Sequence, residues 1–181
     1  MSTGPDFSQG PVPRRSFGER LLGALRLDAT VYEEVEHTPD ALGQAAGVVA
    51  LAALARGLGV SGELGLGGEL LGAFLGWLIG TAVIWVVGVK ILQHTSDFPE
   101  LLRTLGFASA PQLLYVLGVL PLGPLTPLLL LGVMVLGIFA WVIAVRQALD
   151  VTTGRAIGIC LLAQIPGLIL IFLALLAAPA P

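Results

Sequence analysis

Charged residues are scarce in this sequence, and several residue types are almost missing. Only 12% of its 181 residues are charged and 56% are hydrophobic, whereas soluble domains carry roughly 25% charged residues. Such a chain cannot cover itself with polar surface, which excludes an ordinary water-soluble domain. The net charge of -3 argues against a nucleic-acid partner, because phosphate binding requires a clustered cationic face.

Cysteine and histidine are also rare. The single cysteine, Cys160, lies in an apolar run, and the two histidines are far apart in the sequence. One cysteine excludes an intramolecular disulfide, and two scattered histidines cannot build a usual catalytic zinc site. We therefore predict no metal site and no cofactor, and interpret Cys160 as a packing residue. Eight Arg against one Lys and no Asn suggest a GC-rich bacterial genome.

No pattern in the chain is typical of an enzyme. His94, Ser96 and Asp97 have the residue types of a nucleophilic triad, but they crowd one short loop, and triads draw their members from separate elements. A solvated loop with a helix cap explains them better. The glycines of 57–62 match a dinucleotide fingerprint by letter, yet no strand precedes them. We predict an outer loop there and no catalytic or cofactor-binding residue.

Long apolar segments make up most of the chain. Roughly 20 residues of helix cross a hydrocarbon core of about 30 Å, so the sequence predicts an all-α membrane bundle of five transmembrane helices. The predicted spans cover about 41–58, 69–92, 104–121, 125–148 and 156–177. Three prolines in 121–127 predict a tight hairpin, Pro111 and Pro166 should kink their spans, and 152–155 is a polar break.

The segment before the first span has its own pattern. Ser16 and Glu19 have capping-box spacing, and the apolar residues that follow share one face, which predicts an amphipathic helix at the membrane surface with Arg20 on its polar side. We interpret the acidic group around His37 as a solvated face. No cleaved leader is expected. The predicted parts are a disordered cytoplasmic tail (1–15), an amphipathic cytoplasmic or interfacial segment (16–36) and a five-helix transmembrane domain (37–181).

The cations predict the orientation, because Lys and Arg are retained on the cytoplasmic side. With the N-terminus inside, Arg56 alone falls on the outer side. The cytoplasmic cations are then Arg14, Arg15, Arg20, Arg26, Lys90, Arg103, Arg146 and Arg155. We predict a multi-pass protein of the cell membrane, N-terminus in and C-terminus out. Since no Asp, Glu, Lys or Arg lies deep in a span, proton-coupled pumping is disfavoured.

Two sets of residues within the spans suggest helix contacts. Glycine recurs every four residues at Gly68, Gly72, Gly76 and Gly80, which leaves one helix face bare so that a neighbouring backbone can approach. This stripe either packs inside the bundle or joins a homodimer or another membrane protein. Unpaired amides are costly in a membrane, so the glutamines should form interhelical hydrogen bonds or, in a transporter, surround a substrate. They are Gln44, Gln112, Gln147 and Gln164.

Three stretches resemble the YIP family, membrane proteins named for interaction with Ypt/Rab GTPases. The stretch 102–111 is similar to the family's Gly-Tyr followed by a Pro four residues on, with Phe in place of Tyr. The other two stretches are Trp141 with 146–149, and 153–156, which resemble the fourth-span exit and fifth-span entry of prokaryotic members. The Asp-Leu-x-Gly-Pro pattern of eukaryotic members is absent from 40–44. The motif residues are Gly106, Phe107, Pro111, Trp141, Arg146, Gly154 and Ala156.

The resemblance implies a cytoplasmic N-terminal segment and five helices with the C-terminus outside, which matches the orientation predicted from charge. Eukaryotic members act in vesicle traffic with Rab GTPases, but we assign GTPase binding to no residue here. The leading hypothesis is a non-enzymatic scaffold or adaptor acting through its bundle faces and its N-terminal segment. The alternative is a small transporter or channel, with a cavity lined by intramembrane glutamines and Pro-kinked helices.

Overall fold

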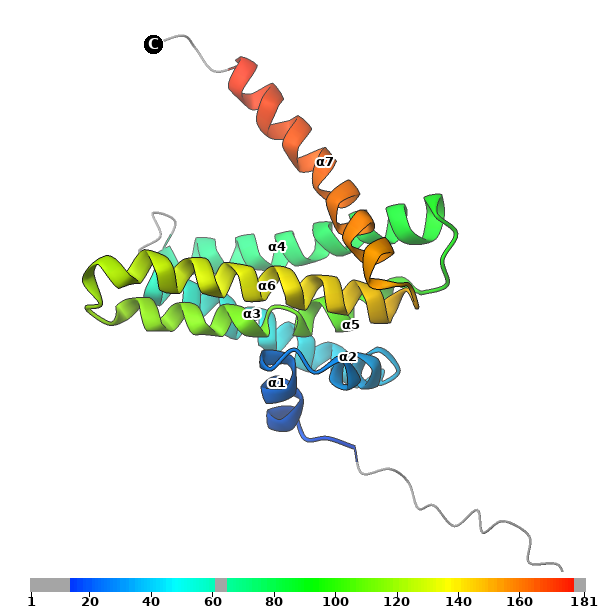
Figure 1. Ribbon diagram of the computed structural model, residues 1–181, viewed down its shortest axis with the longest axis horizontal. Helices are drawn as coiled ribbons and strands as arrows, with labels where there is room; N and C mark the ends of the chain where they lie inside the picture. Colours follow the sequence, from blue (N-terminus) through cyan, green and yellow to red (C-terminus); the bar gives the residue numbers. More distant parts are fainter. Residues whose placement is uncertain (1–13, 61–64, 178–181) are drawn as a thin grey trace, which may run out of the picture.

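The computed structural model describes residues 14–60 and 65–177, with side chains as far as 165. Most of the predicted tail (1–13) and part of the predicted outer loop (61–64) lie outside the described residues. Within those described ranges all regular structure is helical. Figure 1 shows helices lying along one axis, with two short helices below them.

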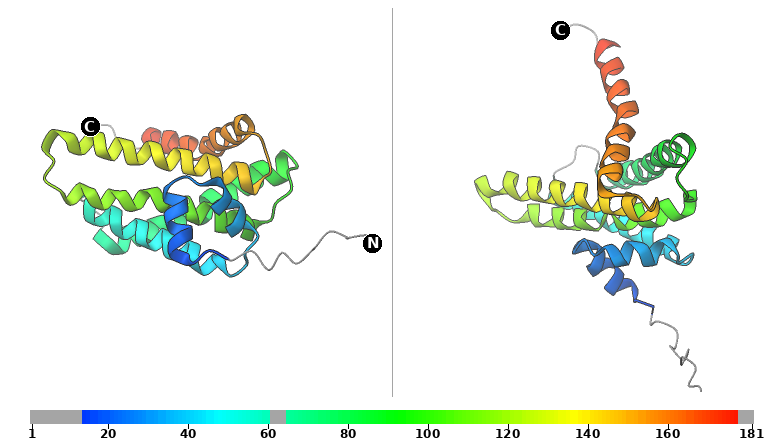
Figure 2. Two further views of the ribbon diagram at one scale, coloured as in Figure 1. Left: turned by 60° about the horizontal axis from the view of Figure 1, so that its bottom comes forward. Right: turned by 45° about the vertical axis from the view of Figure 1, so that its right-hand side comes forward.

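The elements follow one another in a simple up-and-down order. The two short helices are α1 (Phe17–Leu25) and α2 (Ala29–Glu36). The bundle consists of α3 (Ala41–Gly59), α4 (Gly65–Trp85) with the π-helix η1 (Val86–Ile91), α5 (Phe98–Phe107), the 3-10 helices η2 (Ala110–Val119) and η3 (Gly123–Leu125), α6 (Thr126–Ala148) and α7 (Thr153–Ala177). The first four passes run side by side in alternating directions, while α7 leaves the bundle obliquely (Figures 1 and 2).

Three of these segments are long and apolar enough to cross a membrane. They are Ala41–Gly59, Gly65–Ile91 and Gly123–Ala148, and the apolar part of α7 within the described side chains is shorter, Thr153–Ile165. Many large apolar side chains on the outside of the bundle are exposed, among them Leu71, Ile79 and Leu128. Such an exposed apolar surface suits lipid rather than water, and the molecule is a transmembrane helical bundle.

Proline and polar residues set where the helices change. Between Phe107 and Ala110 the third pass changes from α-helix to 3-10 helix, as expected where Pro111 cannot donate the next backbone hydrogen bond. The predicted hairpin holds η3, and α7 is unbroken across Pro166. The predicted polar break at 152–155 is too long, since α7 already begins at Thr153.

Both capped helix starts are present. The Ser16 hydroxyl accepts a hydrogen bond from the Glu19 amide at 3.4 Å, and the Glu19 carboxylate accepts one from the Ser16 amide at 2.7 Å. Asp97 and Glu100 form the same reciprocal pair at the start of α5. The sequence did not predict α2, a second helix that follows a turn in which Leu27 adopts a φ of 63°.

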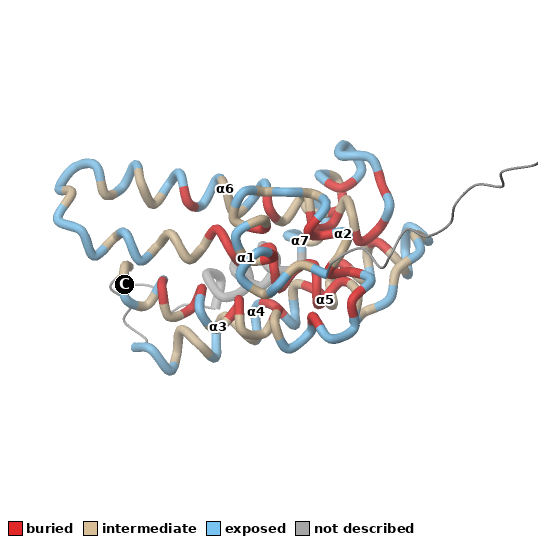
Figure 3. The backbone as a smooth tube through the Cα atoms, turned by 90° about the horizontal axis from the view of Figure 1, so that it is seen from below, coloured by how far each residue is buried: buried red, intermediate tan, exposed pale blue. Residues whose placement is uncertain are grey.

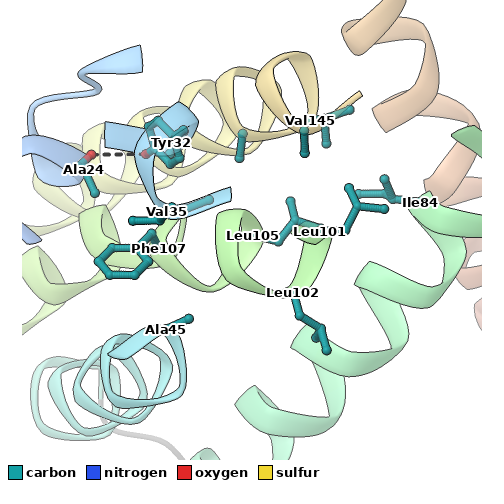
Figure 4. Close-up of a cluster of buried hydrophobic side chains, with 14 of the residues drawn as sticks. Ala24, Tyr32, Val35, Ala45, Ile84, Leu101, Leu102, Leu105, Phe107 and Val145 are labelled. Atoms are coloured by element: carbon teal, nitrogen blue, oxygen red, sulfur yellow. Dashed lines mark hydrogen bonds between the residues drawn. The ribbon is translucent and has the colours of Figure 1, made fainter. Parts of the chain in front are cut away.

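The core sits at one end of the bundle. Every residue of the stretch 101–111 is buried, and it packs between α2, α3, α4 and α6. Buried residues gather around α2 and α5, whereas the far ends of η2 and α6 are exposed (Figure 3). Tyr32 anchors α2 in this core, since its hydroxyl donates to the Ala24 carbonyl at 3.2 Å (Figure 4).

Candidate functional site

A buried arginine joins the N-terminal helices to the first long helix. The Arg20 side chain is only 4% exposed. Its Nε and Nη2 donate to Glu34 Oε1 at 3.0 and 2.8 Å, and its Nη1 donates to Gln44 Oε1 at 2.9 Å. A planar guanidinium can hold several acceptors at once. The expectation that Arg20 faces outward on the polar side of α1 is therefore wrong, because Glu34 and Gln44 meet it on the inner side.

A second buried arginine closes the end of α2. From α5, the Arg103 Nε donates to the carbonyls of Val35 and Glu36 at 3.1 and 3.0 Å, and its Nη2 also donates to the Glu36 carbonyl. The last carbonyls of a helix have no partner within it and carry partial negative charge. Arg103 satisfies both needs and so fixes α2 on the bundle.

The acidic group around His37 is not the solvated face that the sequence suggested. Glu34 is ion-paired with Arg20, and Glu36 is buried with its Oε2 lacking a hydrogen-bond partner among the described residues. Burial raises the pKa of Glu36 to about 7, against the attraction of His37. Glu33 is exposed, and its Oε2 accepts from Gln147 Nε2 at 2.9 Å. These three carboxylates, which are close in sequence, thus occupy three different environments.

The glycine stripe is divided between two surroundings. A Cβ added at Gly80 would lie 2.9 Å from the Trp141 ring, so this glycine admits a neighbouring helix of the same chain. Gly72 and Gly76 have no atom within 4 Å of such a Cβ, and Gly68 is half-buried. The end nearer Gly80 serves packing within the bundle, and a dimer seam at the open end stays a prediction.

The family-motif residues are mainly packing residues. A Cβ at Gly106 would lie 2.7 Å from Ala45 Cβ, so α5 and α3 come together there. Phe107, Pro111 and Ala156 are buried. Of the others, Arg146 donates to Gln147 at 3.0 Å, and Gly154 is exposed with open space around it.

The glutamines separate into two pairs. Gln44 and Gln147 form the hydrogen bonds with Arg20 and Glu33 described above, which confirms their predicted role in joining helices. Gln112 and Gln164 instead line a cavity of about 330 Å³ between η2, α6 and α7. The cavity is lined by Arg56, Gln112, Tyr115, Val133, Met134, Gly137, Ile138, Trp141, Val142, Cys160 and Gln164.

Two smaller hollows adjoin this cavity. One of about 260 Å³ shares Gln112 and Trp141 with it and reaches Gly76. The other, of about 270 Å³, shares Arg56 and Tyr115 and extends among leucines of α6. Three neighbouring hollows thus share lining residues among α3, η2 and α6, whereas the stretch 101–111 is buried throughout.

The polar loop after η1 shows no catalytic arrangement. The Asp97 carboxylate caps α5, and the Ser96 hydroxyl lies 3.3 Å from Glu100 Oε2. Within the described ranges, no three His, Cys, Asp or Glu side chains are grouped to hold a metal ion. Gly59 of the fingerprint-like stretch has a packing role, because a Cβ there would strike the backbone of η2 at Tyr115.

Comparison with known proteins gives a family match over most of the chain. The model of the Yip1 domain matches residues 28–176, from the cap of α2 to the last turn of α7. The chain belongs to the Yip1 family. Both buried arginine contacts with α2 and all seven motif residues lie within or touch this Yip1 region, and the family supports membrane association. No curated protein and no solved structure matches the chain.

The sequence missed the two arginines that join the parts of this site. The sequence predicts Arg20 on the polar side of a surface helix and Arg103 as a cytoplasmic charge, because a cation near a span end normally reaches toward headgroups. One signal was available for Arg103. It is flanked by Leu101, Leu102 and Leu105 on a short amphipathic helix, where a single arginine on or beside the apolar face needs acceptors within the protein.

Proposed function

We propose that this Yip1-family protein is a non-enzymatic membrane scaffold or adaptor whose N-terminal helices form a fixed cytoplasmic platform. The observation that carries the proposal is the attachment of α2 by Arg103 and of α1 by Arg20. A mobile tail would expose changing surfaces, whereas a helix pair held by buried polar contacts presents one constant face. On that face Leu22 is exposed beside Glu19 and Arg26.

We further propose five spans with the N-terminus in the cytoplasm and the C-terminus outside. The arrangement of the helix ends supports this orientation. η1, the last turns of α6 and the first turn of α7, which hold Lys90, Arg146 and Arg155, lie toward one end of the bundle, and the last turns of α3, which hold Arg56, lie toward the opposite end (Figure 1). Retention of cations on the cytoplasmic side gives the same orientation.

Site-specific labelling tests the orientation. In a Cys160→Ser background, a new cysteine at Thr152 should be protected from a membrane-impermeant maleimide in intact cells, and one at Gly123 should be labelled. Permeabilised cells provide the control, because both positions should then react. Labelling of Thr152→Cys in intact cells would contradict the proposed orientation and indicate the opposite one.

Photo-crosslinking tests the platform. A photoreactive amino acid at Leu22 should give one discrete crosslinked product in cells, and the added substitution Arg103→Met should reduce that product about fivefold because α2 is no longer held. Arg26→Met is the matched control, since Arg26 is exposed on α1. An identical product and yield with Arg103→Met would count against a fixed platform.

A small transporter or channel is the second candidate, and the cavity that contains Gln112 and Gln164 supports it. Purified protein in liposomes should then carry small solutes across the bilayer, and Gln112→Leu should abolish that flux. This candidate would be excluded if liposomes that contain the wild-type protein show no greater flux than protein-free liposomes for a panel of anions and amino acids.

A further inference from the structure

The cavity at Gln112 and Gln164 opens sideways toward the surrounding membrane. Two of its lining residues on α6, Met134 and Ile138, are 48% and 56% exposed, so they form its outer rim. Behind the rim Val133 is buried. A molecule in the bilayer can therefore reach this space without passing through either aqueous side.

Its two amides have no hydrogen-bond partner among the described residues. Gln112 comes from η2 and Gln164 from α7, yet both side chains line the one cavity. An amide without a partner in an apolar environment costs free energy, and water is scarce at this depth. Gln112 is half-buried and Gln164 is exposed, so an occupant of this space can reach both amides and supply polar atoms, in particular acceptors for their N–H groups.

A single cation stands at the outer end of the same cavity. The Arg56 side chain is 54% exposed, its Nε lies 3.6 Å from Glu69 Oε2, and its guanidinium carbon lies 5.9 Å from the centre of the Tyr115 ring. The carboxylate faces only one edge of the guanidinium, and a guanidinium can bind a phosphate through two parallel N–H groups. Tyr115 and Gln112 are one 3-10 turn apart, or ~6 Å.

We propose that this cavity binds one anionic phospholipid from the surrounding leaflet. The phosphate pairs with Arg56, the glycerol ester carbonyls accept from the amides of Gln112 and Gln164, and an acyl chain lies along the apolar wall of α6. The combined order of cation, amides and apolar wall matches the order of phosphate, esters and chain in such a lipid. This inference requires that the bundle is embedded in a membrane, but it depends neither on the proposed platform nor on the proposed transport activity.

Native mass spectrometry of the full chain tests the proposal. The protein is placed in nanodiscs of phosphatidylcholine and phosphatidylglycerol in equal amounts, released, and weighed with its retained lipids. Wild type should retain one phosphatidylglycerol. Gln112→Leu with Gln164→Leu should reduce its retention about tenfold, and Arg56→Gln should abolish the preference for phosphatidylglycerol over phosphatidylcholine.

Matched controls separate this site from others. Arg155→Gln removes a cation from a different hollow, beside His94, and Gln93→Leu removes an exposed amide, so both should retain the lipid as wild type does. Inorganic phosphate at 50-fold excess over the lipid should not displace it. Equal retention by the double glutamine variant, a loss caused by Arg155→Gln, displacement by phosphate, or a dimer mass in place of bound lipid would each overturn the proposal.

Discussion

The two ends of the helix bundle are built differently. At the end that carries the N-terminal helices, the stretch 101–111 is buried throughout and two arginines satisfy carbonyl and carboxylate oxygens from those helices. Toward the other end, two hollows that share lining residues lie between η2 and α6, and one of them also reaches α7. Figure 3 shows the same contrast as buried and exposed stretches of chain.

The contrast teaches that the family motif marks the rigid half of the molecule. Gly106, Phe107 and Pro111 lie buried in the packed end, where added side-chain volume meets close neighbours. The cavity is lined instead by residues outside the motif, except Trp141.

The largest effect should come from Arg103→Met in the packed end. The substitution leaves the Val35 and Glu36 carbonyls without their donor, so we expect a loss of about 3 kcal/mol in stability. Thermal unfolding in detergent and hydrogen exchange of the α2 amides measure it. Arg155→Met serves as the exposed control, and slow exchange of α2 in the Arg103 variant would contradict the role assigned to this side chain.

A matched glycine pair should sharpen the comparison. Gly106→Ala places a methyl group 2.7 Å from Ala45 Cβ and 3.2 Å from the Trp77 ring, which should destabilise the protein by about 2 kcal/mol. Gly154→Ala adds the same methyl group in open space near the start of α7 and should be neutral or slightly stabilising. Equal melting temperatures for the two variants would show that the packed end can relax.

The packed end should also respond to pH through Glu36. Its pKa of about 7 in the folded protein lies above the ordinary 4.5, so the folded state holds the proton more tightly than the unfolded state. The stabilisation is complete below pH 4.5 and is lost as pH rises through about 7. Glu33, His37, Glu100, Asp150 and Arg103 are the charged or titratable groups around it.

Glu36→Gln should remove this part of the pH dependence. The amide mimics the protonated carboxyl, so the free energy of unfolding should fall less steeply from pH 5 to 8 than it does for wild type, by roughly 1–2 kcal/mol over the range. Melting temperatures measured across this range should show the same difference in slope. Glu33→Gln is the exposed control. Parallel wild-type and Glu36→Gln curves would rule out a neutral buried carboxyl.

The smallest effect should come from the open end of the glycine stripe. Gly76→Ala meets no atom of the chain within 4 Å, whereas Gly80→Ala meets Trp141 at 2.9 Å. We expect a change within about 1 kcal/mol for Gly76 and a clear loss for Gly80. Gel filtration of Gly76→Leu then tests whether a second copy of the chain packs against this face. An unchanged molecular mass would rule out a dimer contact there.

Periodicity and charge predicted the larger features because they depend on local patterns. The apolar runs, the proline hairpin and the capping pairs at Ser16 and Asp97 all follow from residues close in sequence. The family resemblance is confirmed over 28–176. The contacts of Arg20 and Arg103 were not predictable in this way, since Arg103 meets residues 67 and 68 positions away.

The sequence could not predict the cavity, for a related reason. Four glutamines in or near apolar spans look alike in sequence, but only the fold shows that Gln44 meets an arginine while Gln112 and Gln164 meet empty space. The change to 3-10 helix in η2 turns its side chains differently from an α-helix. A helical wheel with α-helical periodicity would therefore assign Gln112 to the wrong face of this segment.

The π-helical turn at Val86–Ile91 bears on how the second pass tolerates insertions and deletions. A π-turn takes up one residue more than an α-turn, and here it seats Lys90 over the Trp85 ring at 4.5 Å and Gly88 against Leu149. Deleting one residue within this turn should restore α geometry and keep the flanking residues in register, whereas the same deletion in regular α-helix rotates everything downstream by about 100°. The second pass should therefore tolerate the loss of one residue within Val86–Ile91 better than the loss of one residue in the middle of α4.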